Sequence, residues 1–304
     1  MYLLNIIVLI IILSTNLLNA QDDSDNEARE KMIIYEIQDF SYKFFKGDTL
    51  RYKVAAFDSI IINYGKPLEK TRYETIEITC DSVTKDRRFL LSLRMINLIS
   101  DENFGKVEKI RRTTSPWMNR KSHLWIDSLG NRLAAYADDS LSYALSPGGA
   151  FSPYLIFPIN ETYRYINESW MVSSNDTLCE NGVPCGIMNQ SSLFRALKPI
   201  DTLGYDCVRL NYIKTAIGAL NVIMPDNRIR TEATIAGSGA MTISKKYRVP
   251  VHYFANIEQK LLIINSENDE TPGLHFISVD WTLEQFIPSP ERTAPEKKQK
   301  KKKK

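Results

Sequence analysis

The sequence has 304 residues, enough for one large or two modest domains. Hydrophobic residues make up 43% and charged residues 25%, with only 13 glycines and 13 prolines, which excludes a wholly disordered, collagen-like or low-complexity chain. The formal net charge is +3, but seven positive charges lie in the last eight residues, so everything before them carries −4. This mildly acidic remainder argues against a broad basic nucleic-acid-binding face and against sequence-specific nucleic acid binding.

Residues 1–20 predict a cleaved secretory signal peptide. Residues 6–13 are unbroken apolar residues, polar residues follow at 14–16, and Ala20 precedes Gln21. A membrane anchor is the weaker alternative, because a spanning helix needs about 20 apolar residues and the next stretch is acidic instead of basic. No cysteine stands at the cleavage point, which disfavours a lipid-anchored N-terminus. We therefore expect an exported protein in the periplasm, outer envelope or extracellular space.

An acidic segment at 21–31 is expected to be disordered, and a β-rich body is expected at 32–287. Residues 26–38 include a window that suits a strand at least as well as a helix. In the body, apolar and polar residues alternate with a period of two, which is typical of half-buried antiparallel strands. The expected strands are residues 50–62, 73–80, 89–96, 122–126, 131–136, 154–157, 170–173, 205–212, 230–236, 241–247, 251–255, 260–265 and 275–282.

Turn signals separate these strands. A polar turn at 84–87 joins two of them, and residues 127–130 predict a hairpin turn with Gly130 at a positive φ. A short polar turn is expected between 255 and 260. Gly237 and Gly239 lie within a strand pattern, where glycine usually marks a bulge or close packing.

The fold class that follows is all-β and mainly antiparallel: a large curved sheet, a sandwich or a partial barrel with disordered termini. A soft boundary falls at residues 144–152, where proline and two glycines interrupt the pattern. It either divides two β domains or is one long loop within a single sheet.

The chain has four cysteines, Cys80, Cys179, Cys185 and Cys207, an even number that permits disulfides in an exported protein. Cys179 and Cys185 enclose a turn-rich segment that can bring their α-carbons within disulfide range, so we predict a bridge between them. Four free buried thiols are the alternative. No zinc-binding spacing of cysteine and histidine occurs.

Residues 288–304 are expected to form a disordered, lysine-rich tail. Its lysines are candidates for contact with an anionic envelope component, because each lysine near an anionic membrane contributes about 1 kcal/mol. The lysines are Lys297, Lys298, Lys300, Lys301, Lys302, Lys303 and Lys304. A solubilising end with no partner is the alternative.

Motifs for catalysis are missing from the sequence. No P-loop, G-x-S-x-G or H-E-x-x-H pattern is present, so no catalytic residue, cofactor-binding residue or metal ligand is assigned, and no cofactor is expected. His123 and Asp127 could form a base with its orienting acid, but four residues along a strand separate them by about 13 Å. A surface histidine beside a turn aspartate is the simpler interpretation.

Two aromatic clusters are the remaining suggestive feature. Curved sheets use such residues to line apolar cavities, whereas ordinary sheet core explains them equally well. The clusters are Phe40, Tyr42, Phe44 and Phe45, and Phe151, Tyr154 and Phe157.

Several short stretches together resemble an uncharacterised family of exported, β-rich bacterial proteins, over about residues 40–265. The resemblance implies a periplasmic or cell-surface location and no known activity. The stretches are residues 47–52, the strand at 75–81, the turn at 127–130, and residues 168–170, 203–207 and 235–239.

The leading functional hypothesis is a non-catalytic binding module for an apolar or lipid ligand at the cell envelope. One alternative is an exported hydrolase with dispersed catalytic residues, and another is a structural or adhesion component of the surface. The sequence leaves the oligomeric state open.

Overall fold

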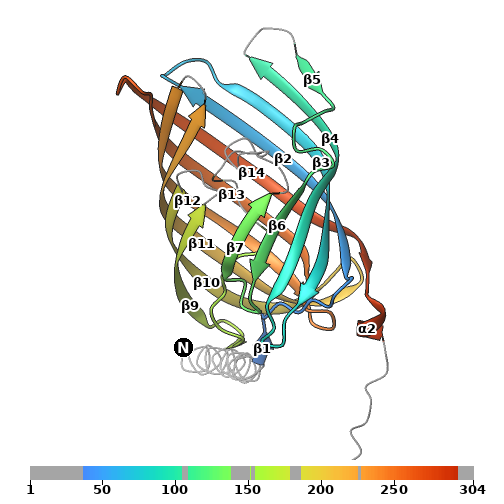
Figure 1. Ribbon diagram of the computed structural model, residues 1–304. Coiled ribbons are helices and arrows are strands. Elements are labelled where there is room, and N and C mark those ends of the chain that lie inside the picture. The colour runs from blue at the N-terminus through green and yellow to red at the C-terminus, as the bar shows by residue number, and fades with distance from the viewer. Residues whose placement is uncertain are drawn as a thin grey trace, which may run out of the picture.

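The computed structural model describes residues 37–104, 109–137, 151, 155–178, 186–224 and 227–293. One 12-stranded antiparallel sheet dominates these residues, which confirms the predicted all-β class. Figure 1 shows that the sheet curls round until it nearly closes into a barrel. Strands from both sides of residues 144–152 belong to this one sheet.

The strands, in chain order, are β1 (Ile37–Asp39), β2 (Thr49–Ile62), β3 (Leu68–Val83), β4 (Phe89–Phe104), β5 (Ile110–Arg112), β6 (Lys121–Ile126), β7 (Arg132–Ala137), β8 (Tyr163–Tyr165), β9 (Ser169–Leu178), β10 (Gly186–Thr202), β11 (Tyr205–Met224), β12 (Asn227–Ser244), β13 (Pro250–Ile264) and β14 (Glu270–Ile287). The short helix α2 (Pro290–Thr293) follows β14. Outside the large sheet, β1 and β8 pair with each other.

The order of strands leaves the two ends of the sheet, β7 and β9, without a ladder between their described residues; the gap between these two edge strands is called the seam. The strands run β7-β6-β4-β3-β2-β14-β13-β12-β11-β10-β9, and β5 pairs with β4. The first long strand, β2, therefore pairs with the last, β14, over Thr49–Ile62 and Gly273–Ile287. Strands β7 and β9 are the two edges, and no ladder between described residues joins them.

The inward face of the sheet carries the core. Along β2, Leu50, Tyr52, Val54 and Ala56 are buried and alternate with more exposed residues, as a period of two requires. The same alternation places Ile76 and Ile78 of β3 inward, as the sequence predicts. The chain between β7 and β9 also contributes to the core, with Leu155, Ile156 and Ile159 buried and without strand structure.

Three sequence expectations about strands are wrong. No turn separates residues 251–255 from 260–265, because Asn256 and Glu258 face outward while Ile257 and Gln259 are buried, and β13 runs unbroken through them. Residues 230–236 and 241–247 likewise form the single strand β12, which ends at Ser244. Residues 155–157 are not a strand, and Tyr154 lies outside the described residues.

The glycines inside β12 serve close packing, as the sequence predicts. A Cβ atom on Gly237 would lie 2.6 Å from the carbonyl oxygen of Asn256, and one on Gly239 would lie 2.3 Å from that of Phe254. No side chain fits at either position without moving the neighbouring strand.

The β6–β7 turn packs closely on the interior segment. Gly130 has φ +81°, as predicted, and a Cβ atom there would lie 2.3 Å from the carbonyl oxygen of Phe157. Gly204 has a similar φ of +78°, but no atom lies within 4 Å of its would-be Cβ.

We expect Gly130→Ala to lower the free energy of unfolding by about 2–4 kcal/mol, because it combines backbone strain with overpacking. Gly204→Ala is the matched control and should cost about 1 kcal/mol, the strain alone. Urea denaturation measures both. Equal losses would show that the contact between the turn and Phe157 contributes nothing.

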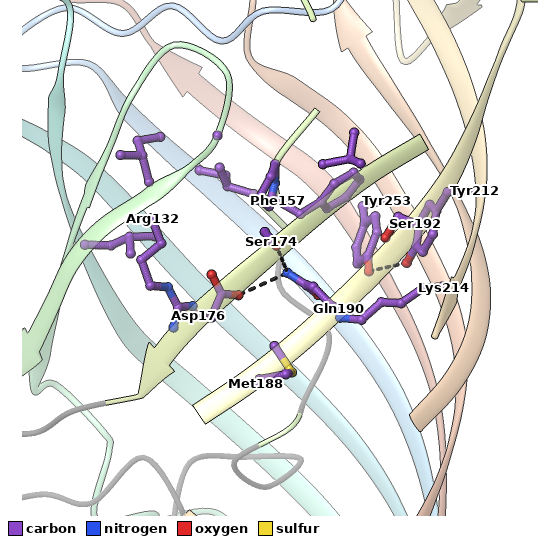
Figure 2. A pocket seen from close by; sticks show the side chains of 16 residues that line it. Arg132, Phe157, Ser174, Asp176, Met188, Gln190, Ser192, Tyr212, Lys214 and Tyr253 are labelled. Carbon is purple, nitrogen blue, oxygen red and sulfur yellow. Dashed lines mark hydrogen bonds between the residues drawn. The ribbon is translucent and has the colours of Figure 1, made fainter. Parts of the chain in front are cut away.

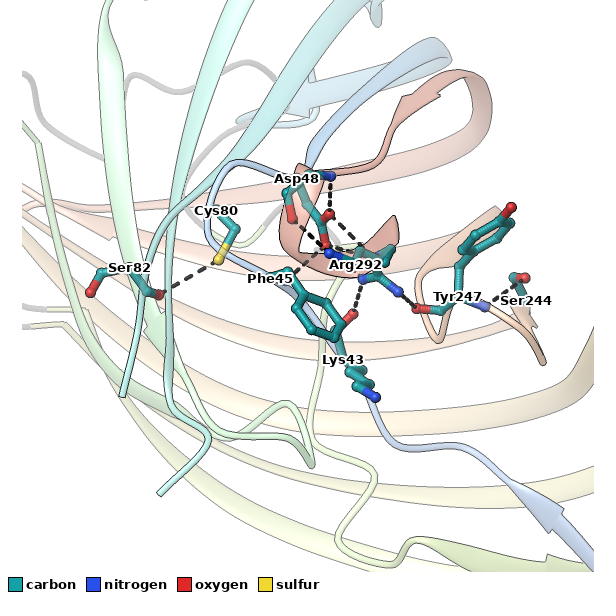
Figure 3. Close-up of polar contacts among 9 residues, drawn as sticks. Lys43, Phe45, Asp48, Cys80, Ser82, Ser244, Tyr247 and Arg292 are labelled. Atoms are coloured by element: carbon teal, nitrogen blue, oxygen red, sulfur yellow. Dashed lines mark hydrogen bonds and ion pairs between the residues drawn. The ribbon is translucent and has the colours of Figure 1, made fainter. Parts of the chain in front are cut away.

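The folded body extends beyond residue 287, so the lysine-rich tail begins later than the sequence suggested. Figure 3 shows Arg292 of α2 meeting the carboxylate of Asp48. The shortest contact is 2.6 Å, and Arg292 also donates to the carbonyl oxygens of Lys43 and Tyr247 at 2.7 and 2.8 Å. Ser289 is buried and its amide donates to Asp48. Residues 288–293 therefore belong to the body, and the tail lysines lie outside the described residues.

Candidate functional site

A cavity lies inside the sheet at the seam between its two edges. Strands β6 and β7 line it from one side, and β9, β10 and β11 line it from the other (Figure 2). The interior segment at 156–158 and Tyr253 of β13 complete the wall. The volume is about 40 Å³, which suits a few water molecules or a group of carboxylate size.

The cavity wall is apolar on one part and polar on another. The polar part is Arg132, Ser174, Asp176, Gln190, Ser192 and Lys214. The apolar part includes Leu124, Ile126, Ile156, Val172 and Met188. Figure 2 shows the polar side chains converging from β7, β9, β10 and β11.

Lys214 is the lysine among the polar groups of this wall. It lies on the inward face of β11, between the buried residues Tyr212 and Ala216, and is itself partly buried. Its ammonium group makes no hydrogen bond or ion pair with any residue in the described part of the chain. The pKa of Lys214 is lowered to about 8, mainly by burial; the charge of Asp176 opposes this shift, and the charge of Arg132 adds to it.

Asp176 is held by its own strand neighbours. Gln190 of β10 donates to Ser174 at 2.9 Å and to Asp176 at 3.0 Å, across the β9–β10 ladder. Figure 2 shows the Arg132 side chain directed toward Asp176 from the opposite edge. The described lining of the cavity thus includes two cationic side chains, Arg132 and Lys214, and one carboxylate, Asp176. One additional negative charge would balance them.

Two tyrosines close the inner end of the cavity. The hydroxyl groups of Tyr212 and Tyr253 lie 2.7 Å apart and share a hydrogen bond, and burial raises the pKa of Tyr212 to about 12. Both hydroxyls therefore stay protonated near neutral pH and can donate or accept a hydrogen bond.

The predicted aromatic clusters form packed core beside this cavity. Phe157 packs against Phe194, Tyr212 and Tyr253, with ring centroids 5.3–5.7 Å apart. Phe40 packs on Trp170 at 5.6 Å, and Phe44 packs edge-on against Phe89 at 5.4 Å. Tyr42 and Phe151 are buried as well. These rings therefore fill much of the interior by packing against one another.

His123 does not pair with Asp127. Asp127 accepts hydrogen bonds from the amides of Leu129 and Asn131 and organises the β6–β7 turn. His123 lies instead on the outward face, where its Nδ1 is 2.9 Å from Ser92 Oγ and 3.9 Å from Asp81.

This outward group does not have the geometry of a catalytic triad. In a triad the acid holds the imidazole nitrogen opposite to the serine, whereas here Ser92 and Asp81 both lie at Nδ1 of His123. Ser92 moreover donates its hydroxyl proton to Asp81. The group is accounted for as a cross-strand polar network between β3, β4 and β6.

The cysteines divide into two described and two undescribed residues. Cys80 and Cys207 are buried free thiols, and burial raises their pKa to about 12 and about 11. Thiols with such pKa values are poor nucleophiles. The predicted Cys179–Cys185 bridge lies outside the described residues and stays a prediction.

Comparison with known proteins adds little. No protein-family model and no curated protein matches the chain. The chain is similar to the crystal structure of a "putative exported protein with YmcC-like fold" from Bacteroides fragilis, with 10% identity, a TM-score of 0.28, and coverage of 82% of this chain and 99% of that one. It is also similar to Salmonella typhi OmpF in complex with daunomycin, with 8% identity, a TM-score of 0.20, and coverage of 77% and 98%. TM-scores this low support no inference about function.

Within the described residues, no helix is long and apolar enough to cross a membrane.

Proposed function

We propose that this chain is an exported, non-catalytic binding protein of the cell envelope that holds an apolar ligand carrying an acidic group. The observation that carries the proposal is Lys214, a partly buried ammonium group without an ion pair among the described residues, facing a partly apolar cavity. The signal-like sequence of residues 1–20 supports export.

Lys214 costs the folded protein stability, because its pKa of about 8 lies well below the ordinary lysine value. A methionine or leucine would fill the same place on β11 without this cost. Residues that break a local rule in this way tend to lie at functional sites. An acidic ligand would supply the missing partner.

The cavity is large enough for only one part of such a ligand, its acidic group. A volume of about 40 Å³ accommodates a carboxylate or similar group next to Lys214, but not an alkyl chain. The chain would extend along Val172 and Met188 toward the unpaired seam between β7 and β9. Free edges on both sides allow the seam to widen without breaking a ladder.

Calorimetric titration with dodecanoate tests the proposal. We expect saturable binding to the mature protein and about tenfold weaker binding to Lys214→Met, because a charge-assisted hydrogen bond is lost. Lys260→Met is the matched control, since Lys260 is exposed on β13 and its removal changes the net charge equally. Dodecanol, which lacks the acid, should bind weakly to all three proteins. Unsaturable binding of dodecanoate, or equal weakening in the control, would refute the proposal.

Lys214→Met should also change the pH dependence of stability. The folded-state pKa of about 8 lies below the unfolded value of about 10.4, so the unfolded state binds more protons between these values and wild-type stability rises with pH there. Below pH 8 the variant should be more stable than the wild type by about 1–3 kcal/mol. The advantage should shrink toward pH 10.5. Urea denaturation at pH 7 and pH 10 measures it; a variant less stable than the wild type at pH 7 would contradict the assigned cost.

A further inference from the structure

A second concave site lies at the end of the barrel that carries α2. Its wall comes from the chain before β2, from the β3–β4 turn, from the β12–β13 turn and from Glu291 of α2. The volume is about 700 Å³, within the usual range for small-molecule sites. Its floor is aromatic and includes the buried residues Tyr42, Phe44 and Phe89.

The charge of this cleft is strongly one-sided. Among the described residues that line it, the acidic ones are Asp39 and Glu291, and the basic ones are Lys43, Lys85, Arg87, Lys245, Lys246 and Arg248. Two of the basic residues have acid partners: Arg248 pairs with Asp39, and Lys245 pairs with Asp206 at 3.0 Å. The other four form no ion pair with a described residue. An acidic body therefore concentrates unpaired positive charge in one cleft, which attracts anions.

Several of these cations are held in place. Lys43 lies over the ring of Phe45 at 5.1 Å, and Lys246 lies over the ring of Tyr247 at 4.9 Å. Arg248 donates to the carbonyl oxygen and hydroxyl of Ser41. The cations are thus oriented before a ligand arrives, which lowers the entropic cost of binding.

Two arginines of the cleft have an unusual backbone. Arg87 has φ +59° and Arg248 has φ +60°, in the β3–β4 and β12–β13 turns respectively. A bulky residue rarely adopts this left-handed conformation, which costs roughly 1 kcal/mol where glycine would cost little. Strain of this kind tends to lie at ligand-binding positions.

Arg292 of α2 bonds to two of the segments that form the rim of the cleft. It donates to the carbonyl oxygens of Lys43 and Tyr247, so it fixes the two segments that carry the rim lysines Lys43 and Lys246 (Figure 3). Thr293, the next residue, is the last one that the structure describes. The seven lysines of the tail begin four residues further on.

We propose that this cleft binds an organic phosphate, either free or as the headgroup of a lipid. Phosphate oxygens match several lysine and arginine donors at once, and the aromatic floor can pack against the organic part. The proposal is independent of the ligand at the seam cavity, because the two sites share none of their lining residues.

The test compares two double variants of the full mature chain that lose the same charge. Lys43→Gln with Lys246→Gln changes the cleft. Lys66→Gln with Lys260→Gln changes two exposed lysines away from the cleft. One arm measures inorganic pyrophosphate by calorimetry, and the other measures sedimentation with phosphatidic acid and phosphatidylcholine vesicles. A chain ending at Thr293 separates the cleft from the tail.

We expect the cleft variant to bind about tenfold more weakly, with the control within about twofold of the wild type, and binding to weaken with salt. Binding in the pyrophosphate arm identifies a soluble phosphate, and binding only to vesicles identifies a lipid headgroup. The proposal is overturned if the wild type binds neither probe or if both double variants lose the same binding affinity. It is also overturned if the chain ending at Thr293 loses all binding, because binding then depends on the tail alone.

Discussion

Replacing Arg72 by methionine is expected to lower the free energy of unfolding by about 3–5 kcal/mol, the largest effect of any single change proposed for this chain. Arg72 is 4% exposed on the inward face of β3 and contacts Asp58 at 2.6 Å and also Glu74. Both carboxylates are buried, and methionine would remove the arginine charge that pairs with both of them. Urea denaturation at pH 7 measures the loss.

The same cluster sets the pH dependence of that loss. Burial alone would raise the pKa of Asp58, but the hydrogen bond from His275 at 3.0 Å and the charge of Arg72 outweigh burial and hold it below its usual value. The stability that this lowered pKa contributes is present above about pH 4 and is lost as the pH falls. The difference between wild type and Arg72→Met should therefore narrow toward pH 3.

Arg111→Met is the control for this prediction. Arg111 forms a two-point ion pair with Asp101 at 2.7 and 2.9 Å, but both side chains are exposed. Exposed pairs contribute at most about 1 kcal/mol. If Arg72→Met lowered the free energy of unfolding no more than Arg111→Met, the buried cluster would contribute no more stability than an exposed ion pair.

Arg292→Met should cost about 3 kcal/mol and release the end of the body. Asp48 is fully buried, and without Arg292 the donors left to its carboxylate among the described residues are the amides of Phe45 and Ser289, at 2.8 and 2.9 Å. The amide of Arg292 itself bonds to Ser289, so hydrogen exchange at residues 289 and 292 should accelerate.

Lys53→Met is the matched change, because Lys53 pairs with Glu284 on β14 with both side chains at least one-third exposed. It should cost less than about 1 kcal/mol and leave hydrogen exchange at residue 289 unchanged. Unchanged exchange in Arg292→Met would mean that α2 is held by something other than the Asp48 contact.

The sequence predicts most of the strands because the rule of alternation holds wherever one face meets an apolar core. β2 is expected at 50–62 and observed at Thr49–Ile62, and the Gly130 turn has the expected positive φ. The rule fails where the inward face is polar. β10 has no expected strand because its inward residues Gln190 and Ser192 face the seam cavity.

Long-range pairing could not be read from the sequence. Asp58 and His275 are 217 residues apart and meet only because β2 pairs with β14. The position of Lys214 is hidden from the sequence for the same reason, since the charges near it, Arg132 on β7 and Asp176 on β9, come close to it only when the sheet curls. A lysine at an inward position of an alternating strand, as in residues 212–216, is the signal that could have found it.

A crystal structure of the mature protein with a bromine-substituted dodecanoate tests the central claim most directly. The proposed function predicts that the ligand carboxylate lies within about 3.2 Å of Lys214 Nζ, with the bromine signal along the seam between β7 and β9. A ligand found on the outward face, or a cavity at Lys214 that holds only ordered water at saturating ligand, would contradict the account.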